Sequence, residues 1–232
     1  MIKVEHVSFT YAGKKTVYTD LSFSTVDGRM NCIIGKNGVG KSTIFDMISG
    51  LVDPQAGTID PLLSSAEIIY QMQGVPMLPA MTGQNILDIF RDLNPGTQRT
   101  DEFLTAVYQE NVVALLNEKY RDMSGGERRL LIIYAMCTLK RALYLFDEPT
   151  SGLDPISARK ILGLLSDLAT CSQVIFTGHN LFELQNVPCH VIFIANQHCI
   201  FQGNYEELMA RYSENDPVQT FVDALKADQI VS

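Results

Sequence analysis

The sequence predicts an α/β fold in which a mainly parallel sheet carries helices on its faces, with an antiparallel β layer at its edge and an inserted helical segment. Three observations support this prediction. Short segments rich in Val, Ile and Phe alternate with stretches of helix length, which is the pattern of parallel sheets. The first two segments instead follow each other closely and alternate polar with apolar residues, as antiparallel strands do. No convincing strand lies between Asn85 and Lys140.

The clearest strands of the parallel sheet are short and apolar, and they are Met30–Ile34, Ala142–Phe146 and Gln173–Thr177. Each ends in a turn that carries polar residues, namely Gly35 onward, Asp147-Glu148 and Gly178-His179. Ligands of open parallel sheets bind at the carboxyl ends of the strands. We therefore expect these three turns to meet at one site.

The remaining elements follow from alternation and from breaker residues. The antiparallel pair is Ile2–Phe9 and Val17–Thr25, joined by a turn at Gly13-Lys14-Lys15. The predicted helices of the insertion are Asn85–Asp92, Thr100–Asn117 and Gly125–Lys140, and two short helices, Asn204–Tyr212 and Pro217–Ala227, are predicted in the tail. We expect a single domain, residues 1–232, in which 1–84 and 141–232 form the α/β core with its β layer and 85–140 form a helical subdomain.

The composition narrows the class of partners and the compartment. The 232 residues are 46% hydrophobic and 19% charged, as in ordinary globular proteins. Eighteen basic against 26 acidic residues give a net charge of −8, which disfavours nucleic acid as a partner. The apolar runs are far shorter than the ~20 residues of a membrane-spanning helix, and no signal peptide is recognisable. Five cysteines indicate reduced thiols in the cytosol, with Cys32, Cys137 and Cys171 expected to be buried.

A glycine-rich motif of nine residues follows the first parallel strand and precedes the helix-like Ile44–Gly50. It has the full Gly-x-x-x-x-Gly-Lys-Ser pattern, and its expected phosphate contacts come from Gly35, Asn37, Gly38, Gly40, Lys41, Ser42 and Thr43. The glycines let backbone N–H groups surround a phosphate closely. Lys41 would reach the terminal phosphates, and the Ser42 hydroxyl would ligate Mg²⁺. The motif therefore predicts binding of a nucleoside triphosphate with magnesium.

Two carboxylates end the apolar segment Leu143–Phe146. Successive residues of a strand point to opposite faces, so Asp147 and Glu148 are expected to have different roles. Asp147 suits the coordination shell of the magnesium ion, and Glu148 suits activation of the attacking water.

With these two motifs placed, Met123-Ser124-Gly125-Gly126-Glu127 resembles the Leu-Ser-Gly-Gly-Gln signature of the ATP-binding cassette (ABC) family. The resemblance covers nearly the whole chain and implies that the nucleotide is ATP. By their places in the family's motifs, Tyr11 would stack on adenine, Gln73 would reach magnesium and His179 would hold the γ-phosphate. Asp154 ends Ser151-Gly152-Leu153-Asp154, which is similar to the family's D-loop.

The resemblance also implies that two chains share each site. Ser124, Gly125 and Gly126 open a helix of the insertion, and we expect that helix to have no route to the sheet edge that carries Lys41. In a head-to-tail pair, the signature of each chain would complete the γ-phosphate pocket of the other. Glu127 in place of Gln, Gln84 in place of Glu and Cys189-His190 in place of Asp-Arg are departures from the family's commonest pattern.

Two functions remain open on this basis. The first is the ATP-hydrolysing motor subunit of a membrane transporter, held at the inner face of the cell membrane by a separate permease and paired with a second ATPase subunit. The second is a soluble ABC ATPase, for example an iron–sulphur assembly partner. The apolar, proline-containing Val75–Met81 either docks the permease or packs the helical insertion on the core.

A metal site is a further alternative, because histidine and cysteine both bind zinc. The candidate ligands are Cys189-His190 and His198-Cys199, in a predicted hairpin that turns at Asn196-Gln197. Pairing Ala195 with His198 puts His190 opposite Gly203, which places the two histidines too far apart to share a metal.

Overall fold

The computed structural model describes residues 1–13, 16–72, 74, 77–96, 98–213 and 216–231. Its main sheet has six strands in the order β5-β6-β7-β3-β8-β9. The strands are β3 (Met30–Ile34), β5 (Ile68–Gln71), β6 (Leu143–Phe146), β7 (Gln173–Gly178), β8 (Cys189–Ala195) and β9 (His198–Asn204). All neighbours are parallel except β8 and β9, which are antiparallel. The three predicted parallel strands are confirmed, whereas β5 was not predicted.

The antiparallel sheet has three strands in the order β2-β1-β4, namely β1 (Lys3–Thr10), β2 (Thr16–Ser24) and β4 (Ala56–Asp60). The predicted pairing of the first two segments is confirmed. The third strand escaped prediction because only Ile59 of its five residues is buried, so it shows no apolar pattern. Lys14 and Lys15 of the predicted turn lie outside the described residues.

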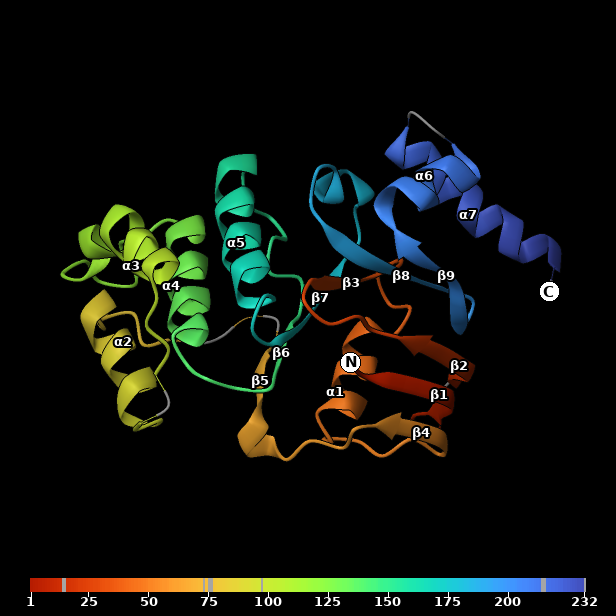
Figure 1. Cartoon of the computed structure of the whole chain (residues 1–232), viewed down its shortest axis with the longest axis horizontal. Helices are drawn as coiled ribbons and strands as arrows, with labels where there is room; N and C mark the ends of the chain where they lie inside the picture. Colours follow the sequence, from red (N-terminus) through yellow and green to blue (C-terminus); the bar gives the residue numbers. More distant parts are fainter. Residues whose placement is uncertain (14–15, 73, 75–76, 97, 214–215, 232) are drawn as a thin grey trace.

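The main sheet separates two hydrophobic clusters, as the alternation of side chains requires. Met30, Cys32 and Ile34 of β3 pack in one cluster together with α4 (Gly125–Cys137) and α5 (Pro155–Leu168). Ile33 packs in the other cluster, which also contains α1 (Lys41–Ile48) and the antiparallel sheet. Figure 1 shows α1 and the antiparallel sheet on one side of the main sheet and α5 on the other. Both faces are therefore covered, and the strands of its centre are mostly apolar, with Asn31 and Thr177 as buried polar residues.

Helices fill the chain between β5 and β6 and gather at one end of the molecule (Figure 1). They are α2 (Gly83–Asp92), α3 (Glu102–Val107) and α4 (Gly125–Cys137). The single helix predicted over Thr100–Asn117 is wrong, because α3 continues as a π-helical turn, η2 (Tyr108–Val112), and a 3₁₀ turn, η3 (Val113–Leu115). The β-branched pair Val112-Val113, which disfavours regular α-helix, lies at this change of geometry.

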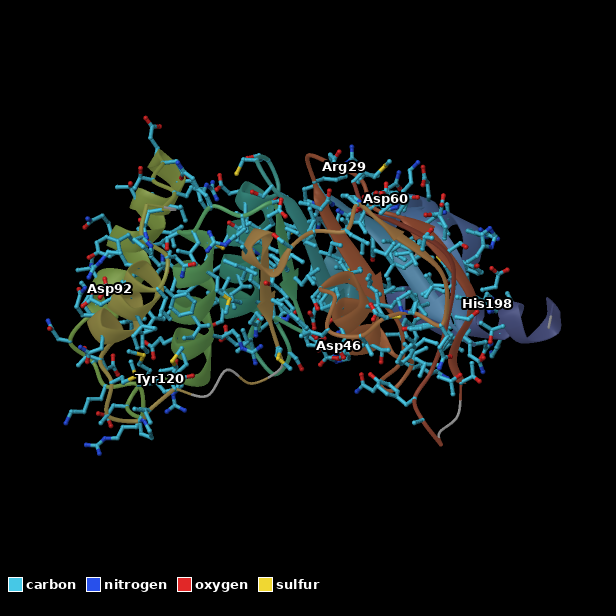
Figure 2. The ribbon with its side chains drawn as sticks, turned by 90° about the horizontal axis from the view of Figure 1, so that it is seen from below. Arg29, Asp46, Asp60, Asp92, Tyr120 and His198 are labelled. Atoms are coloured by element: carbon cyan, nitrogen blue, oxygen red, sulfur yellow. The ribbon has the colours of Figure 1, made fainter. Side chains whose placement is uncertain are left out.

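The C-terminal part of the chain carries η4 (Leu181–Leu184), α6 (Tyr205–Tyr212) and α7 (Pro217–Val231), which confirms the two predicted tail helices. Ala195 pairs with His198 as predicted, but His190 pairs with Asn204 and not with Gly203, because the register shifts between Phe193 and Ile194. Figure 2 shows His198 at the opposite end of the molecule from Asp92 and Tyr120.

Cys171 is exposed and not buried as expected, because it lies in the turn after α5.

The structure also bears on metal ligands and on membrane-spanning helices. Over the residues that the structure describes, no cluster of His, Cys, Asp or Glu could hold a metal ion. Within the same residues, no helix has the length and apolar character needed to cross a membrane.

Candidate functional site

The turns after β3, β6 and β7 lie at one edge of the main sheet, because these strands are parallel neighbours. Three predicted site residues meet there. Glu148 Oε1 lies 3.7 Å from Lys41 Nζ and 3.6 Å from His179 Nδ1. The side chains of Lys41 and Glu148 are only 5% and 13% exposed, so this ion pair is shielded from water. The predicted meeting of the three turns is confirmed.

The glycine-rich loop has a backbone that residues with side chains could not adopt. Gly38 and Gly40 have φ values of +78° and +112°, in the left-handed region. A Cβ atom on Gly40 would lie 2.5 Å from the hydroxyl of Tyr18, and one on Gly35 would lie 2.6 Å from the carbonyl oxygen of Ile194. The loop is therefore confined between β2 and β8 at Gly40 and Gly35, whereas Lys36, Asn37 and Gly38 between them are exposed.

Lys41 begins α1 and turns back toward the loop. Its Nζ donates hydrogen bonds to the carbonyl oxygens of Gly35, at 2.9 Å, and Lys36, at 3.3 Å. Burial lowers the pKa of Lys41, and the carboxylates of Glu148 and Asp147 act in the opposite direction. The ammonium group is thus held at the centre of the site by backbone carbonyls and by a carboxylate.

Asp147 is buried and has hydroxyl donors on both carboxylate oxygens. Ser42 Oγ donates to Oδ2 and Thr177 Oγ1 donates to Oδ1, each at 2.6 Å. The same Thr177 hydroxyl accepts from the backbone N–H of Glu148 at 2.8 Å. Thr177 was not predicted as a site residue, because its contact with Asp147 arises only when β7 packs beside β6.

Tyr11 lies beside the first turn of α1. Its hydroxyl is hydrogen-bonded to Thr43 Oγ1 at 3.3 Å, and its ring meets that of Phe9 edge-on, with centroids 4.8 Å apart. The predicted aromatic is therefore adjacent to the glycine-rich loop. Gln73 lies outside the described residues. Gln71, two positions earlier, is buried, and its Oε1 has no hydrogen-bond partner among the residues that the structure describes.

Ser124 and Glu127 form a capping box at the start of α4. Ser124 Oγ accepts from the backbone N–H of Glu127, and Glu127 Oε2 accepts from the backbone N–H of Ser124 at 2.7 Å. Hydrogen bonds from the Ser124 side chain and from its backbone N–H to the carboxylate lower the pKa of Glu127. The glutamate that departs from the usual signature therefore completes the capping box whose N-cap is Ser124.

The start of α4 lies against the start of α5. A Cβ atom on Gly126 would lie 2.6 Å from Ser157 Oγ, which in turn donates to Asp154 Oδ2 at 2.6 Å. Asp154 also caps α5 by accepting from the backbone N–H groups of Ile156 and Ser157. The structure thus brings the signature residues to Asp154. In the described parts of the chain, no hydrogen bond or ion pair joins residues 124–126 to residues 35–43.

One contact of α4 was not predicted. Arg129 Nη1 donates to the carbonyl oxygen of Glu148 at 3.1 Å. The expectation that this helix has no route to the sheet edge is therefore wrong at Arg129, because the side chain of arginine is long enough to bridge from the helix to the turn after β6.

The fold and the loop between β3 and α1 define a P-loop nucleoside triphosphatase. The family model described as "ABC transporter" matches residues 18–151. The energy-coupling factor transporter ATP-binding protein EcfA1 of Fusobacterium nucleatum is 30% identical, over 97% of this chain and 89% of that protein. The ABC transporter A family member 1 of Dictyostelium discoideum is 27% identical over 87% of this chain, which spans only 24% of that longer protein.

A solved structure, "Structure of ATP binding subunit of ABC transporter", superposes with a TM-score of 0.77 at 20% identity and covers 97% of this chain and 99% of that chain. The chain belongs to the ABC transporter family, and it is an ATP-binding ATPase. The family resemblance and the fold class predicted from the sequence are confirmed.

Proposed function

We propose that this chain is the motor subunit of a membrane transporter, which pairs with a second ATPase subunit when ATP binds and drives a separate permease. The observation that carries the proposal is the meeting of Lys41, Glu148 and His179 at one sheet edge in a member of this family. Hydrolysis at that edge would let the two ATPase subunits separate, and the free energy of hydrolysis would drive the permease.

The loop residues fit a phosphate group. The loop offers backbone N–H groups at its glycines, and the neighbours of Gly35 and Gly40 leave no space for a side chain, which suits the close approach of a triphosphate. Lys41 would place its charge at the terminal phosphates, and Tyr11 would stack on the adenine ring. The contacts proposed from the loop itself are those of Gly35, Asn37, Gly38, Gly40, Lys41, Ser42 and Thr43.

The donor set beside the loop fits Mg²⁺, which prefers oxygen ligands. Ser42 Oγ and the Asp147 carboxylate are already in contact, so they present oxygen atoms at one point. We propose that these two residues hold the ion and that Gln73 reaches it. In such sites the chemistry supplied by magnesium is charge neutralisation at the phosphate oxygens.

Glu148 is the proposed general base. Its carboxylate would accept a proton from the water that attacks the γ-phosphorus, and the buried Lys41 beside it would offset the negative charge of the phosphates. The position of His179, 3.6 Å from the same carboxylate oxygen, suits a contact with the γ-phosphate. We assign both residues and Lys41, together with Gln73, to catalysis.

A second chain would complete each site. The start of α4, with Ser124, Gly125 and Gly126, presents backbone N–H groups and favours an anion. Its neighbour Asp154 opens α5 on the same surface. We propose that this surface meets the nucleotide bound by a second subunit, identical or closely related.

The segment after Gln73 is the proposed permease contact. Met77 and Met81 are partly buried and pack against the core, so core packing accounts for them. Leu78 between them is 71% exposed, and Met72 is 56% exposed. Because these exposed apolar residues are close to Gln73 in the sequence, a permease bound to them would respond to nucleotide binding.

The test is purification of the tagged chain from its own cells in a mild detergent. A membrane-spanning chain should co-purify with the wild type, and Leu78→Ser should lose it without a change in melting temperature. Leu62→Ser is the matched control, because Leu62 is 82% exposed but belongs to the turn after β4. Absence of any membrane-spanning chain from the wild-type preparation would favour the soluble alternative.

A further inference from the structure

Glu148 has an unusual backbone. Its φ is +48°, in the left-handed region that residues with a Cβ atom rarely adopt. A residue keeps such a conformation only where its surroundings hold it, and such residues concentrate at functional sites. The direction of the Glu148 side chain depends on this φ value, because rotation about φ moves the peptide and the side chain relative to each other.

Among the residues that the structure describes, Thr177, Ser151 and Arg129 hold the peptide groups of Glu148 by hydrogen bonds. Its N–H donates to Thr177 Oγ1, and its carbonyl oxygen accepts from the N–H of Ser151 at 3.2 Å and from Arg129 Nη1 at 3.1 Å. Thr177 lies near the end of β7, and Ser151 lies in the turn after β6. Arg129 alone comes from α4, is half-buried and carries a charge, and hydrogen bonds from charged donors are the stronger ones.

We propose that Arg129 is a positioning residue for ATP hydrolysis. By clamping the carbonyl oxygen of Glu148 it keeps the left-handed turn, and the turn keeps the carboxylate between Lys41 and His179. Among the residues that the structure describes, Arg129 forms no hydrogen bond or ion pair with either of those two side chains, so its effect passes through Glu148. The inference rests on the proposed role of Glu148 as the base.

Arg129→Met tests the inference, because methionine keeps an apolar stem in the half-buried position and removes the donor. Release of the turn should displace the carboxylate, and a displacement of ~1 Å can cost on the order of 100-fold in rate. We expect kcat to fall at least about tenfold, with KM and the dissociation constant for ATP within about threefold of the wild type. Arg129→Lys, which restores a charged donor, should recover most of the loss.

Arg128→Met is the matched control. Arg128 precedes Arg129 on α4, but it donates to the carbonyl oxygens of Tyr120 and Arg121 and lies 5.2 Å from the Tyr120 ring centroid. Figure 2 shows Tyr120 at the far end of the helical part of the molecule. This control should keep kcat within about threefold of the wild type.

A second set of variants separates the outcomes. In a Glu148→Gln background, Arg129→Met should lower the residual rate by less than about threefold, because the group that it positions is already gone. A further loss of tenfold in that background, no rescue by lysine, or a Met variant that does not fold would overturn the inference. Near-normal turnover of Arg129→Met beside an inactive Glu148→Gln would overturn it and leave the proposed function standing. Normal turnover of Glu148→Gln itself would refute the proposed role of that residue.

Discussion

At the scale of single residues, the site depends on one carboxylate that lies near a lysine ammonium group and a histidine ring. The Glu148 carboxylate lies between Lys41 and His179. Hydrogen bonds with Thr177, Ser151 and Arg129 hold the backbone of Glu148. Asp147, its neighbour, is turned to Ser42 and Thr177 instead. Two adjacent carboxylates thus have separate surroundings, which is why we assign one to the metal and the other to the water.

Glu148→Gln should bind ATP and fail to hydrolyse it. The amide cannot accept the proton of the attacking water, and a general base contributes about 100-fold to 10,000-fold in rate. The phosphate loop is untouched, so the affinity for ATP should stay within about threefold. Phosphate release and titration with a fluorescent ATP analogue measure the two properties. A turnover close to that of the wild type would remove Glu148 from the mechanism.

The sequence predicted those residues of the site whose role follows from local spacing. Lys41 and Ser42 stand at fixed positions in a glycine-rich motif, and Asp147 ends an apolar strand. Thr177 and Arg129 could not be predicted in the same way. Their contacts with Asp147 and Glu148 arise only when β7 and α4 pack beside β6, and no local pattern encodes that packing.

At the scale of elements, prediction succeeded for segments with a continuous apolar or periodic pattern. β3 and β6 are buried along their whole length and were found from composition alone. β4 exposes four of its five residues, and it is a strand because it pairs antiparallel with β1. The break after α3 likewise depends on packing, since Leu104, Val112 and Leu115 are buried on both sides of it.

The cap of α4 yields a prediction for stability. Glu127→Ala removes the acceptor for the backbone N–H of Ser124 and should lower the free energy of unfolding by about 1 kcal/mol at pH 7.5. The hydrogen bonds from Ser124 lower the pKa of Glu127 below its ordinary 4.5, so the carboxylate stabilises the fold fully above that pH. The difference from wild type should therefore shrink as the pH falls below 4.5.

Urea unfolding at pH 7.5 and pH 3.5 checks this dependence. Glu127→Gln is the control, since its amide oxygen still accepts the hydrogen bond but does not titrate. The stability gap between wild type and the Gln variant should be narrower at pH 3.5 than at pH 7.5. An equal gap at both pH values would mean that the charge of Glu127 does not contribute to the cap.

At the scale of the whole molecule, the main result is that the phosphate loop and the signature residues at the start of α4 lie at different places in the chain. The phosphate loop and Glu148 lie at the carboxyl edge of the main sheet, whereas Ser124 and Gly126 lie at the start of α4, against Asp154 of α5. Arg129 links that helix to the turn after β6 within one chain. We therefore propose that ATP binding by one chain and engagement of the signature of another are coupled through α4.

Pairing of two chains around ATP is the central claim, and light scattering of Glu148→Gln tests it directly. Without nucleotide the variant should have the monomer mass of 25.8 kDa. Saturating ATP with magnesium should double that mass, because the nucleotide is retained and would join the loop of one chain to Ser124 of the other. Gly126→Asp on the same background, with its folding checked by circular dichroism, should stay monomeric, because a carboxylate would face the phosphates. A Glu148→Gln chain that binds ATP and keeps the monomer mass would contradict the claim.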